Sequence, residues 1–418
     1  MIQRGGSSSP GRSPPLRPEN IVHQTMNTSS SSAARASSRS SHIVGSVRWT
    51  AAAILGALAA CAVPPPAAPP PSPAVVAPVA PGTPTPILRE RSRWVPVAWD
   101  ALPGWDADAL ADAWPALLRG CERPPPGWAA LCATALLTEP GDDAATREWL
   151  MRHLQPYRVE SRDGRADGLI TGYYEPLIDA RRVPDAVFRT PLHAPPDDLG
   201  TRRPYWTRQQ LDTLPAARAA LRGREIAWVA DPLDALVLQI QGSGRLRLTE
   251  PDARVRTVRV AYAGHNDHPY RSVGRWLIEQ GQLAAEQASW PAIKAWARRH
   301  PGRVQEMLWA NPRVVFFREE ALPDPGVGPR GAMGVPLTPQ RSIAVDPKSI
   351  PYGTPVWLDT TAPLSAAPLR RLVMAQDTGS AIVGAVRADY FWGWDGDAEA
   401  QAGRMKQPLR MWVLWPRE

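Results

Sequence analysis

The most informative stretch lies near the C-terminus, where residues 372–382 read LVMAQDTGSAI and residues 387–393 read RADYFWG. The apolar run before Asp377 has the length of a strand and is broken by Thr-Gly just after the acid, so this carboxylate is expected at a strand end. Asp389 stands between an arginine and three aromatic residues. Such surroundings exclude water, which disfavours the charged form and predicts a raised pKa, as a general acid requires. Alternatively, both aspartates cap turns and pair with Arg387.

A third acid stands upstream. Asp346 lies in the segment SIAVDPKSIPYGT at 342–354. With their flanking residues, the three aspartates resemble the 3D domain, named for them, that ends the MltA-type lytic murein transglycosylases. The resemblance continues to the closing MWVLW at 411–415. Since 3D domains occur in other cell-wall proteins as well, the upstream sequence has to show whether the resemblance is to the MltA family in particular.

Three upstream segments are similar to signatures of the MltA family, in the family's order: TGYYEP at 171–176, ALVLQIQGSGR at 235–245 and AGHNDHPYRSVGRWLIEQG at 263–281. In the second segment a period of two predicts a strand that places Gln239 and Gln241 on one face. The glycines that follow predict a turn where a ligand approaches the backbone closely. No Gly-Lys-Ser/Thr follows, which argues against a nucleotide loop.

The resemblance implies a mainly β fold with accessory helices, in which a double-psi β-barrel (91–176 and 321–418) carries an inserted, smaller β domain (177–320), with a groove between the two. Periodicity by itself predicts only many short strands and a few helices. The expected helices include 107–119, with Asp106 as its cap, and further helices at 128–137, 144–154, 272–280 and 290–299.

The same resemblance implies a peptidoglycan lytic transglycosylase, which cleaves the β-1,4 bond between N-acetylmuramic acid and N-acetylglucosamine. The muramyl 6-hydroxyl attacks C1 of its own ring and leaves a 1,6-anhydro end, so no water and no second carboxylate are needed. Asp389 matches the family's catalytic aspartate, Asp377 is expected beside it, and Asp346 further out, where it holds a loop. No cofactor is expected.

Substrate contacts in the groove are expected from five residues of the upstream signatures: Thr171, Tyr173, Gln241, Gly242 and Ser243. Amides and hydroxyls suit a sugar, whose own hydroxyls both donate and accept hydrogen bonds. The sequence departs from the family at Ser380, where a second glycine is usual. Serine costs little there unless the position needs a positive φ.

Two other functions use the same residues. An inverting glycan hydrolase would employ Asp377 as base and Asp389 as acid, with room between them for a water. A non-catalytic peptidoglycan-binding lipoprotein would only hold the wall. A metal site built on His265, Asp267 and His268 is disfavoured, because this loop offers no further ligand at a useful spacing.

The N-terminal region 1–60 predicts export. Arg48 precedes a short apolar run that ends in Leu-Ala-Ala-Cys, a lipobox pattern that predicts lipid on Cys61, with an ordinary secretory signal as the alternative. The residue after the cysteine is Ala62 and not aspartate, which favours the outer membrane over the inner membrane and a periplasmic location. Both Met1 and Met26 stay open as the start. The Pro-rich segment 62–90 predicts an extended tether.

The net charge of the chain outside residues 1–60 is small. The formal charge is +8, but residues 1–60 hold six arginines and one glutamate, so +8 minus +5 leaves +3 for the rest. So small an excess argues against nucleic acid as a partner.

Cys121 and Cys132 remain as an even pair, for which a disulfide and two free buried thiols both stay open. The expected partners are peptidoglycan glycan strands, an outer-membrane lipid anchor and a cell-wall synthesis complex.

Overall fold

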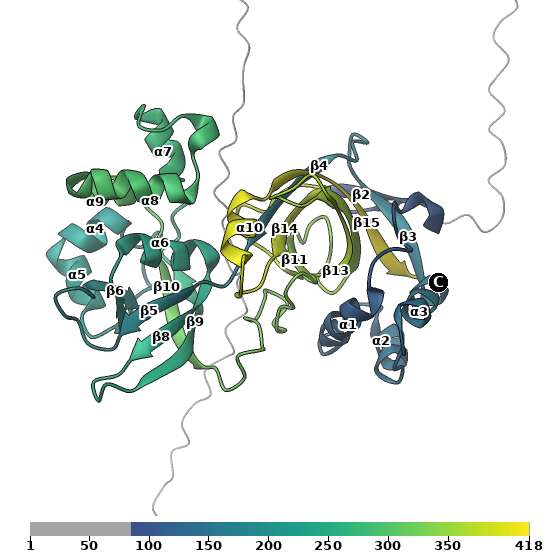
Figure 1. The fold of residues 1–418 in the computed structure, drawn as a ribbon, viewed down its shortest axis with the longest axis horizontal. Coiled ribbons are helices and arrows are strands. Elements are labelled where there is room, and N and C mark those ends of the chain that lie inside the picture. The colour runs from purple at the N-terminus through teal and green to yellow at the C-terminus, as the bar shows by residue number, and fades with distance from the viewer. Residues whose placement is uncertain (1–84, 418) are drawn as a thin grey trace, which may run out of the picture. The chain divides into compact units, whose positions relative to one another are not determined.

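The computed structural model describes residues 85–417 and is mainly β, with accessory helices (Figure 1). This confirms the predicted fold class. Its strands form a nine-stranded and a six-stranded sheet. The predicted signal region, the lipid site at Cys61 and most of the Pro-rich tether lie outside the described residues. Within residues 85–417, no helix combines the length and the apolar character needed to cross a membrane.

The nine-stranded sheet contains a closed barrel. Its members are β1 (Ile87–Leu88), β2 (Ser92–Pro96), β3 (Leu154–Ser161), β4 (Gly168–Tyr173), β11 (Ser342–Val345), β12 (Pro355–Thr361), β13 (Pro368–Asp377), β14 (Arg387–Phe391) and β15 (Lys406–Pro416). The order is β1-β2-β3-β15-β12-β13-β11-β14-β4, and β15 also pairs with β4. Six strands, from β4 through β14, β11, β13 and β12 to β15, therefore close on themselves. Closure removes the free edges of a sheet.

Two pairs of barrel strands are parallel: β11 with β13, and β4 with β14. Every residue of β14 and β11 is buried. Parallel strands covered on both faces are expected to be apolar throughout, so the polar residues found inside these strands need a specific reason. Asp389 is such a residue.

Helices α1 (Trp114–Cys121), α2 (Ala129–Leu136) and α3 (Asp143–His153) pack on the barrel through a core that includes Trp357 and Trp412. A disulfide joins Cys121 on α1 to Cys132 on α2. Asp142 caps α3 by accepting a hydrogen bond from the backbone N–H of Ala145.

The predicted helix start at Ala107 is wrong. A 3₁₀ turn occupies Leu110–Ala113, and α1 begins only at Trp114. The reason is tertiary: Asp108, which a helix starting at 107 would carry in its first turn, is buried in an ion pair with Arg341 of the barrel region.

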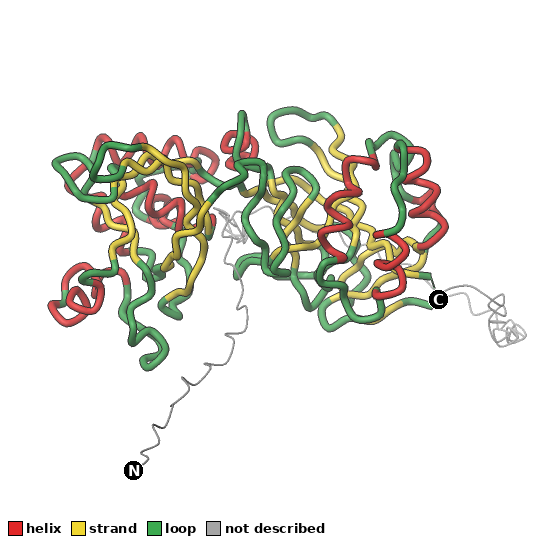
Figure 2. Tube along the Cα trace, turned by 90° about the horizontal axis from the view of Figure 1, so that it is seen from below, coloured by secondary structure: helices red, strands yellow, loops and turns green. Residues whose placement is uncertain are grey.

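The six-stranded sheet has the order β10-β9-β8-β5-β7-β6. Its strands are β5 (Leu177–Arg181), β6 (Thr190–His193), β7 (Glu225–Val229), β8 (Ser243–Thr249), β9 (Val255–His265) and β10 (Val315–Ala321). The accompanying helices are α4 (Arg208–Thr213), α5 (Pro215–Leu221), α6 (Pro232–Gln241), α7 (Val273–Glu279), α8 (Trp290–Arg299) and α9 (Val304–Trp309), while α10 (Ala398–Arg404) follows β14. In Figure 2 the helices flank the strands.

The predicted strand through Gln239 and Gln241 is wrong, because Pro232–Gln241 forms α6. Asp231 caps this helix, and Gly242 ends it with a φ of 80°. Six of its residues are buried, on several sides, so an apolar run that looks like a strand is a buried helix. Gln239 and Gln241 consequently point in different directions: Gln239 accepts from Arg208, and Gln241 accepts from the backbone N–H of Tyr174.

Candidate active site

Strand register brings the two C-terminal aspartates into one row. Ala344 on β11 lies opposite Asp377 of β13 on one side and opposite Asp389 of β14 on the other, and Thr171 of β4 lies opposite Asp389. Residues opposite each other on neighbouring strands share a face of the sheet. With strands about 4.8 Å apart, the two acids are separated by roughly 10 Å of backbone. The small side chain of Ala344 lies between them.

Asp389 has a defined hydrogen-bonded surrounding. Its side chain has no exposed surface, and Thr171 Oγ1 donates to its Oδ1 at 2.6 Å. Arg387 stands two residues earlier on the same strand, hence on the same face, and its Nη2 donates to Thr171 Oγ1 at 2.9 Å. Burial lowers the pKa of the Arg387 guanidinium, and the charge of Asp389 works against this. Arg387, Thr171 and Asp389 therefore form a buried polar chain.

Asp377 is held by three donors. The backbone N–H groups of Ala332 and Thr378 donate to Oδ1, both at 2.9 Å, and the Tyr173 hydroxyl donates to Oδ2 at 2.9 Å. Burial, together with the negative charges of Asp377 and Asp389, raises the pKa of Tyr173 well above its usual value. The phenol thus stays protonated and serves as a permanent donor to Asp377.

Asp346 lies outside this row. Its Oδ1 accepts from the backbone N–H of Lys348 at 3.0 Å, and its Oδ2 accepts from that of Gly384 at 2.9 Å. Arg91 approaches Oδ2 to 3.4 Å. These contacts tie the turn after β11 to the segment that connects β13 with β14.

The predicted sugar contacts fall in two places. Thr171 and Tyr173 point to the aspartates. The other three lie where α6 meets β8: Gln241 is the last residue of α6, Gly242 is its C-cap, and Ser243 is a buried residue of β8 that lies opposite Ala261. The predicted open Gly-Ser-Gly turn is wrong, because Ser243 and Gly244 already belong to the strand.

The loop with the two histidines forms internal contacts. The backbone N–H of Asp267 donates to His265 Nδ1 at 2.9 Å, and His268 Nε2 lies 2.8 Å from the carbonyl oxygen of Tyr205. In the part of the chain that the structure describes, no cluster of three or more His, Cys, Asp or Glu residues is placed to hold a metal ion. Ser380 is not among the described non-glycine residues with positive φ, so serine in place of glycine causes no backbone strain there.

Sequence reasoning missed several residues around the site. Arg387, which the sequence offered only as a charge partner of the aspartates, also donates to Thr171. Ala344 and Glu175 were not identified. Glu175 has no exposed surface and binds Arg245 and Arg259, through Nε at 2.8 and 2.6 Å, while its backbone N–H donates to Gly393 at 2.8 Å. It thereby links the six-stranded sheet to the segment after β14.

Two models of known protein families match the chain. Residues 169–318 match the model of the MltA specific insert domain, and residues 341–415 match that of the 3D domain. The protein is therefore of the class that combines a 3D domain with an MltA-specific insert.

Individual relatives narrow the class. The chain is 31% identical over 269 residues to membrane-bound lytic murein transglycosylase A of Vibrio cholerae, covering 62% of this chain and 69% of that protein. Among solved structures it resembles MltA from Neisseria gonorrhoeae (31% identity, TM-score 0.67, 79% and 96% of the two chains). It also resembles the lytic transglycosylase LtgG of Burkholderia pseudomallei (48% identity, TM-score 0.56, 78% and 96%). The chain belongs to the MltA family of lytic murein transglycosylases.

Proposed function

We propose that this enzyme cleaves the β-1,4 bond between N-acetylmuramic acid and N-acetylglucosamine in peptidoglycan and leaves 1,6-anhydro ends, with Asp389 as the single general acid and base. The relatives' names support a lytic transglycosylase acting on murein. The observation that carries the role of Asp389 is its position in the barrel: a carboxylate in the middle of a fully buried strand, bonded to Thr171 and facing the same side as Asp377.

The chemistry needs one proton donor that afterwards accepts a proton. Asp389 protonates the leaving glycosidic oxygen while the C1–O bond breaks. The resulting carboxylate then takes the proton of the muramyl 6-hydroxyl as its oxygen bonds to C1, so the aspartic acid is restored. Because the attacking hydroxyl belongs to the same sugar, it has the high effective concentration of an intramolecular group.

The surroundings of Asp377 favour this reaction over inverting hydrolysis. An inverting enzyme needs a second carboxylate that is free to deprotonate a water. Asp377 accepts two backbone N–H groups on one oxygen and a tyrosine hydroxyl on the other. Its acceptor capacity is largely taken up. We therefore assign to Asp377 the positioning of Tyr173 and a contribution to the electrostatic potential at the site, and not the activation of a water.

Access to Asp389 requires a movement, because the side chain has no exposed surface. Ala344, which lies between the two acids, belongs to a buried cluster with Leu337, Ile382 and Phe391. Ile382 comes from the segment between β13 and β14, whose neighbours Val383 and Ser380 are exposed. We assign to this segment the displacement that admits the sugar.

The location is proposed on the same basis. Relatives carry the designation membrane-bound, and the Leu-Ala-Ala-Cys pattern supports a lipid on Cys61 that anchors the protein to the outer membrane, facing the periplasm. Glycan strands of peptidoglycan are then the substrate, and a cell-wall synthesis complex is the proposed protein partner.

The test is product analysis. Purified sacculi are digested with the protein, and the soluble muropeptides are weighed by mass spectrometry, because an anhydro product lacks one water relative to a hydrolysed one. We expect anhydro products from the wild type and none from Asp389→Asn. Asp359→Asn is the matched control, since Asp359 lies on barrel strand β12 and pairs with Arg370 and Arg410.

Each of the other outcomes contradicts a specific part of the proposed function. Products with reducing ends would establish hydrolysis. Sacculi that are bound but not solubilised by the wild type would establish a non-catalytic wall-binding protein. Solubilisation by Asp389→Asn at the wild-type rate would remove Asp389 from the mechanism.

A further inference from the structure

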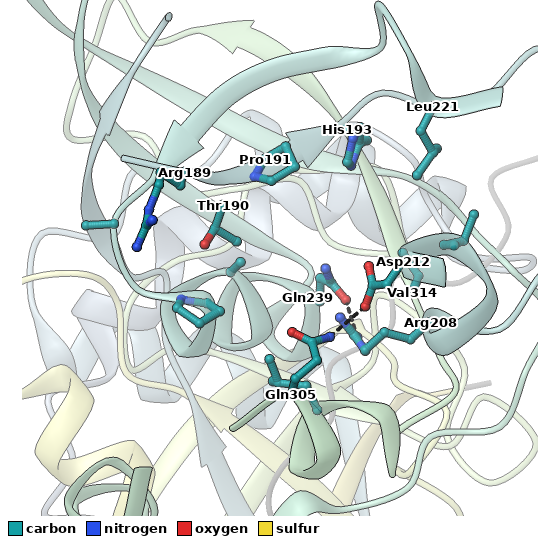
Figure 3. Close-up of a pocket in the computed structure, with 15 residues that line it drawn as sticks. Arg189, Thr190, Pro191, His193, Arg208, Asp212, Leu221, Gln239, Gln305 and Val314 are labelled. Atoms are coloured by element: carbon teal, nitrogen blue, oxygen red, sulfur yellow. Dashed lines mark hydrogen bonds between the residues drawn. The ribbon is translucent and has the colours of Figure 1, made fainter. Parts of the chain in front are cut away.

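A pocket of about 510 Å³ opens among elements of the six-stranded sheet region (Figure 3). Its walls come from β6, α4, α5, α6 and α9, and no barrel strand contributes to it. Pockets that bind small ligands have volumes of roughly 300–1,000 Å³. This pocket is therefore large enough for a ligand of a few residues, and the proposed reaction does not use it.

One wall carries a fixed cation. Arg208 Nη2 donates to Gln239 Oε1 and to the carbonyl oxygen of Arg313, both at 2.6 Å, and its Nε donates to the carbonyl oxygen of Asn311 at 3.1 Å. Burial lowers the pKa of Arg208 to about 10, so the guanidinium remains charged at neutral pH. Its hydrogen-bond partners are neutral acceptors, which orient the guanidinium, and the charge of Asp212 acts on it from nearby.

A fixed carboxylate lies near it. Asp212 Oδ2 accepts from Gln305 Nε2 at 2.7 Å and from Trp309 Nε1 at 2.8 Å. Surrounding protein atoms raise the pKa of Asp212, although the residue keeps accessible surface. Both of these hydrogen bonds use Oδ2, so Oδ1 is available to a donor from outside the chain, while the charges of Arg208 and Arg218 act on the carboxylate without a close ion pair among the described residues.

A second cation stands on the other side. Arg189 is exposed, lies immediately before β6, and forms no hydrogen bond or ion pair with another described residue. Figure 3 shows Arg189, Thr190 and His193 across the pocket from Asp212. The pocket thus presents an exposed arginine at one end, and a hydrogen-bonded carboxylate near a hydrogen-bonded arginine at the other.

The lining excludes several ligand classes. Apart from the imidazole of His193, no aromatic ring lines the pocket, so no tryptophan, tyrosine or phenylalanine face is offered to a sugar ring or a nucleobase. The lining holds two arginines and one aspartate, so the pocket offers charged groups of both signs. Leu211, Leu221 and Val314 add apolar surface to the lining. A short peptide with a free carboxylate and a free ammonium group matches this pattern.

We propose that this pocket binds the peptide stem that branches from the glycan strand, with a stem carboxylate on Arg189 and the ammonium group of its diamino acid on Asp212. The proposal rests on peptidoglycan being the substrate, as proposed above. It makes the inserted region a reader of stem peptides, separate from the acids that act on the glycan. Strands with stems are then bound more tightly than bare glycan.

The experiment is calorimetric titration of the purified protein with the tripeptide L-alanyl-γ-D-glutamyl-meso-diaminopimelate. The same peptide with acetylated amines and the stem-free glycan chitohexaose serve as comparison ligands. We expect the free tripeptide to bind, acetylation to weaken binding at least tenfold, and Arg189→Glu to weaken it at least tenfold. Asp212→Asn should abolish the preference for the free amine. Arg298→Glu is the matched control, because Arg298 is an exposed arginine on α8 outside the pocket.

The outcomes separate the two proposals. Tripeptide binding that is absent, or that is unaffected by Arg189→Glu and Asp212→Asn, overturns the pocket assignment even where anhydro products form normally. Tripeptide binding with the expected losses supports the pocket, even where Asp389→Asn still solubilises sacculi and the catalytic assignment fails. Since Asp212 also holds Gln305 and Trp309, circular dichroism checks its folding, and Arg189→Glu carries the test if that variant unfolds.

Discussion

The proposed role of Thr171 in positioning Asp389 depends on its hydroxyl group. Its hydroxyl donates to Asp389 at 2.6 Å and accepts from Arg387 at 2.9 Å. Thr171→Val keeps the branched shape that suits a strand and removes both bonds. Losing a hydrogen bond to a charged group costs about 1.5–3 kcal/mol, which is roughly a ten- to hundred-fold loss of rate if the bond acts in the transition state. We expect the rate of anhydro product formation to fall by that amount.

The matched control is Thr360→Val. Thr360 is also a buried barrel threonine, and its hydroxyl donates to the carbonyl oxygen of Pro408 at 2.7 Å, on a different pair of strands. Thr360→Val should lose a similar amount of stability in urea unfolding but form anhydro products at the wild-type rate. Equal rates for Thr171→Val and the wild type would contradict the positioning role of Thr171.

At the residue scale, the sequence identified Asp389 and Asp377 because each follows or interrupts an apolar run and matches a family pattern. It did not identify Ala344 as the residue between them. That position depends on which residues of three strands lie opposite one another. Register between segments more than 30 positions apart leaves no mark in local sequence.

The connection between β13 and β14 is the element to which we assign access to Asp389. Ile382→Ala removes a side chain that is 1% exposed from the cluster around Ala344. Truncating a buried isoleucine costs about 2–5 kcal/mol of stability. If this segment must move for the sugar to enter, the truncation makes that movement easier. We therefore expect kcat/KM of Ile382→Ala, measured well below its unfolding temperature, to equal or exceed that of the wild type.

Urea unfolding and initial rates on sacculi measure the two effects. Val383→Ala is the neighbouring control, since Val383 is 52% exposed and should change neither quantity appreciably. A tenfold loss of kcat/KM in folded Ile382→Ala would argue that Ile382 positions the substrate or the acids and does not cover them.

The helical segment before β3 depends on another long-range contact. Asp108 and Arg341 are each 4% exposed and form two hydrogen bonds, at 2.7 and 3.1 Å, and Asp108 also accepts from the backbone N–H of Leu372 at 2.9 Å. Asp108→Ala leaves Arg341 buried with only the exposed Asp112, at 3.6 Å, as a charge partner, and breaking a buried ion pair typically costs about 3–5 kcal/mol. We expect a corresponding loss in the free energy of unfolding in urea.

The exposed pair of Asp179 and Arg247 provides the comparison, since both side chains are more than half exposed (56% and 57%). Asp179→Ala should cost less than about 1 kcal/mol. If the two variants lose the same stability, the buried pair has no special part in holding the helices to the barrel.

At the element scale, the helix over Trp290–Arg299 was predicted with its observed bounds, whereas α6 was predicted as a strand. The first helix has apolar residues on one side only. The second is apolar on several sides, and a period of two or of 3.6 then fits almost equally well. Its boundary residues, Asp231-Pro232 and Gly242, were the better signal.

For the molecule as a whole, buried tyrosines predict sensitivity to alkali. Burial raises the pKa of Tyr173, Tyr174, Tyr205, Tyr270, Tyr352 and Tyr390. In the unfolded chain a tyrosine loses its proton near pH 10. The folded state therefore binds more protons above that pH, and this contribution to stability, complete below about pH 10, is lost as the pH rises through the folded pKa values.

Tyr352 measures the effect of one side chain, because burial raises its pKa to about 12. One tyrosine contributes about 1.4 kcal/mol per pH unit between its unfolded and folded pKa values. The free energy of unfolding of Tyr352→Phe should thus fall less steeply than that of the wild type between pH 10 and pH 12. Identical slopes for the two proteins would mean that Tyr352 ionises in the folded state as readily as in the unfolded chain.

The sequence by itself determined the chemical groups, the family and the mainly β fold, because these follow from residue types in local order: three aspartates with their flanks, the TGYYEP and QGSG strings, and short apolar runs. Only the tertiary structure decided that β15 closes the barrel on β4, that Thr171 meets Asp389, and that Arg189, Arg208 and Asp212 share a pocket. Each of these contacts joins segments brought together by packing and strand register, and their energies arise only once the chain has folded.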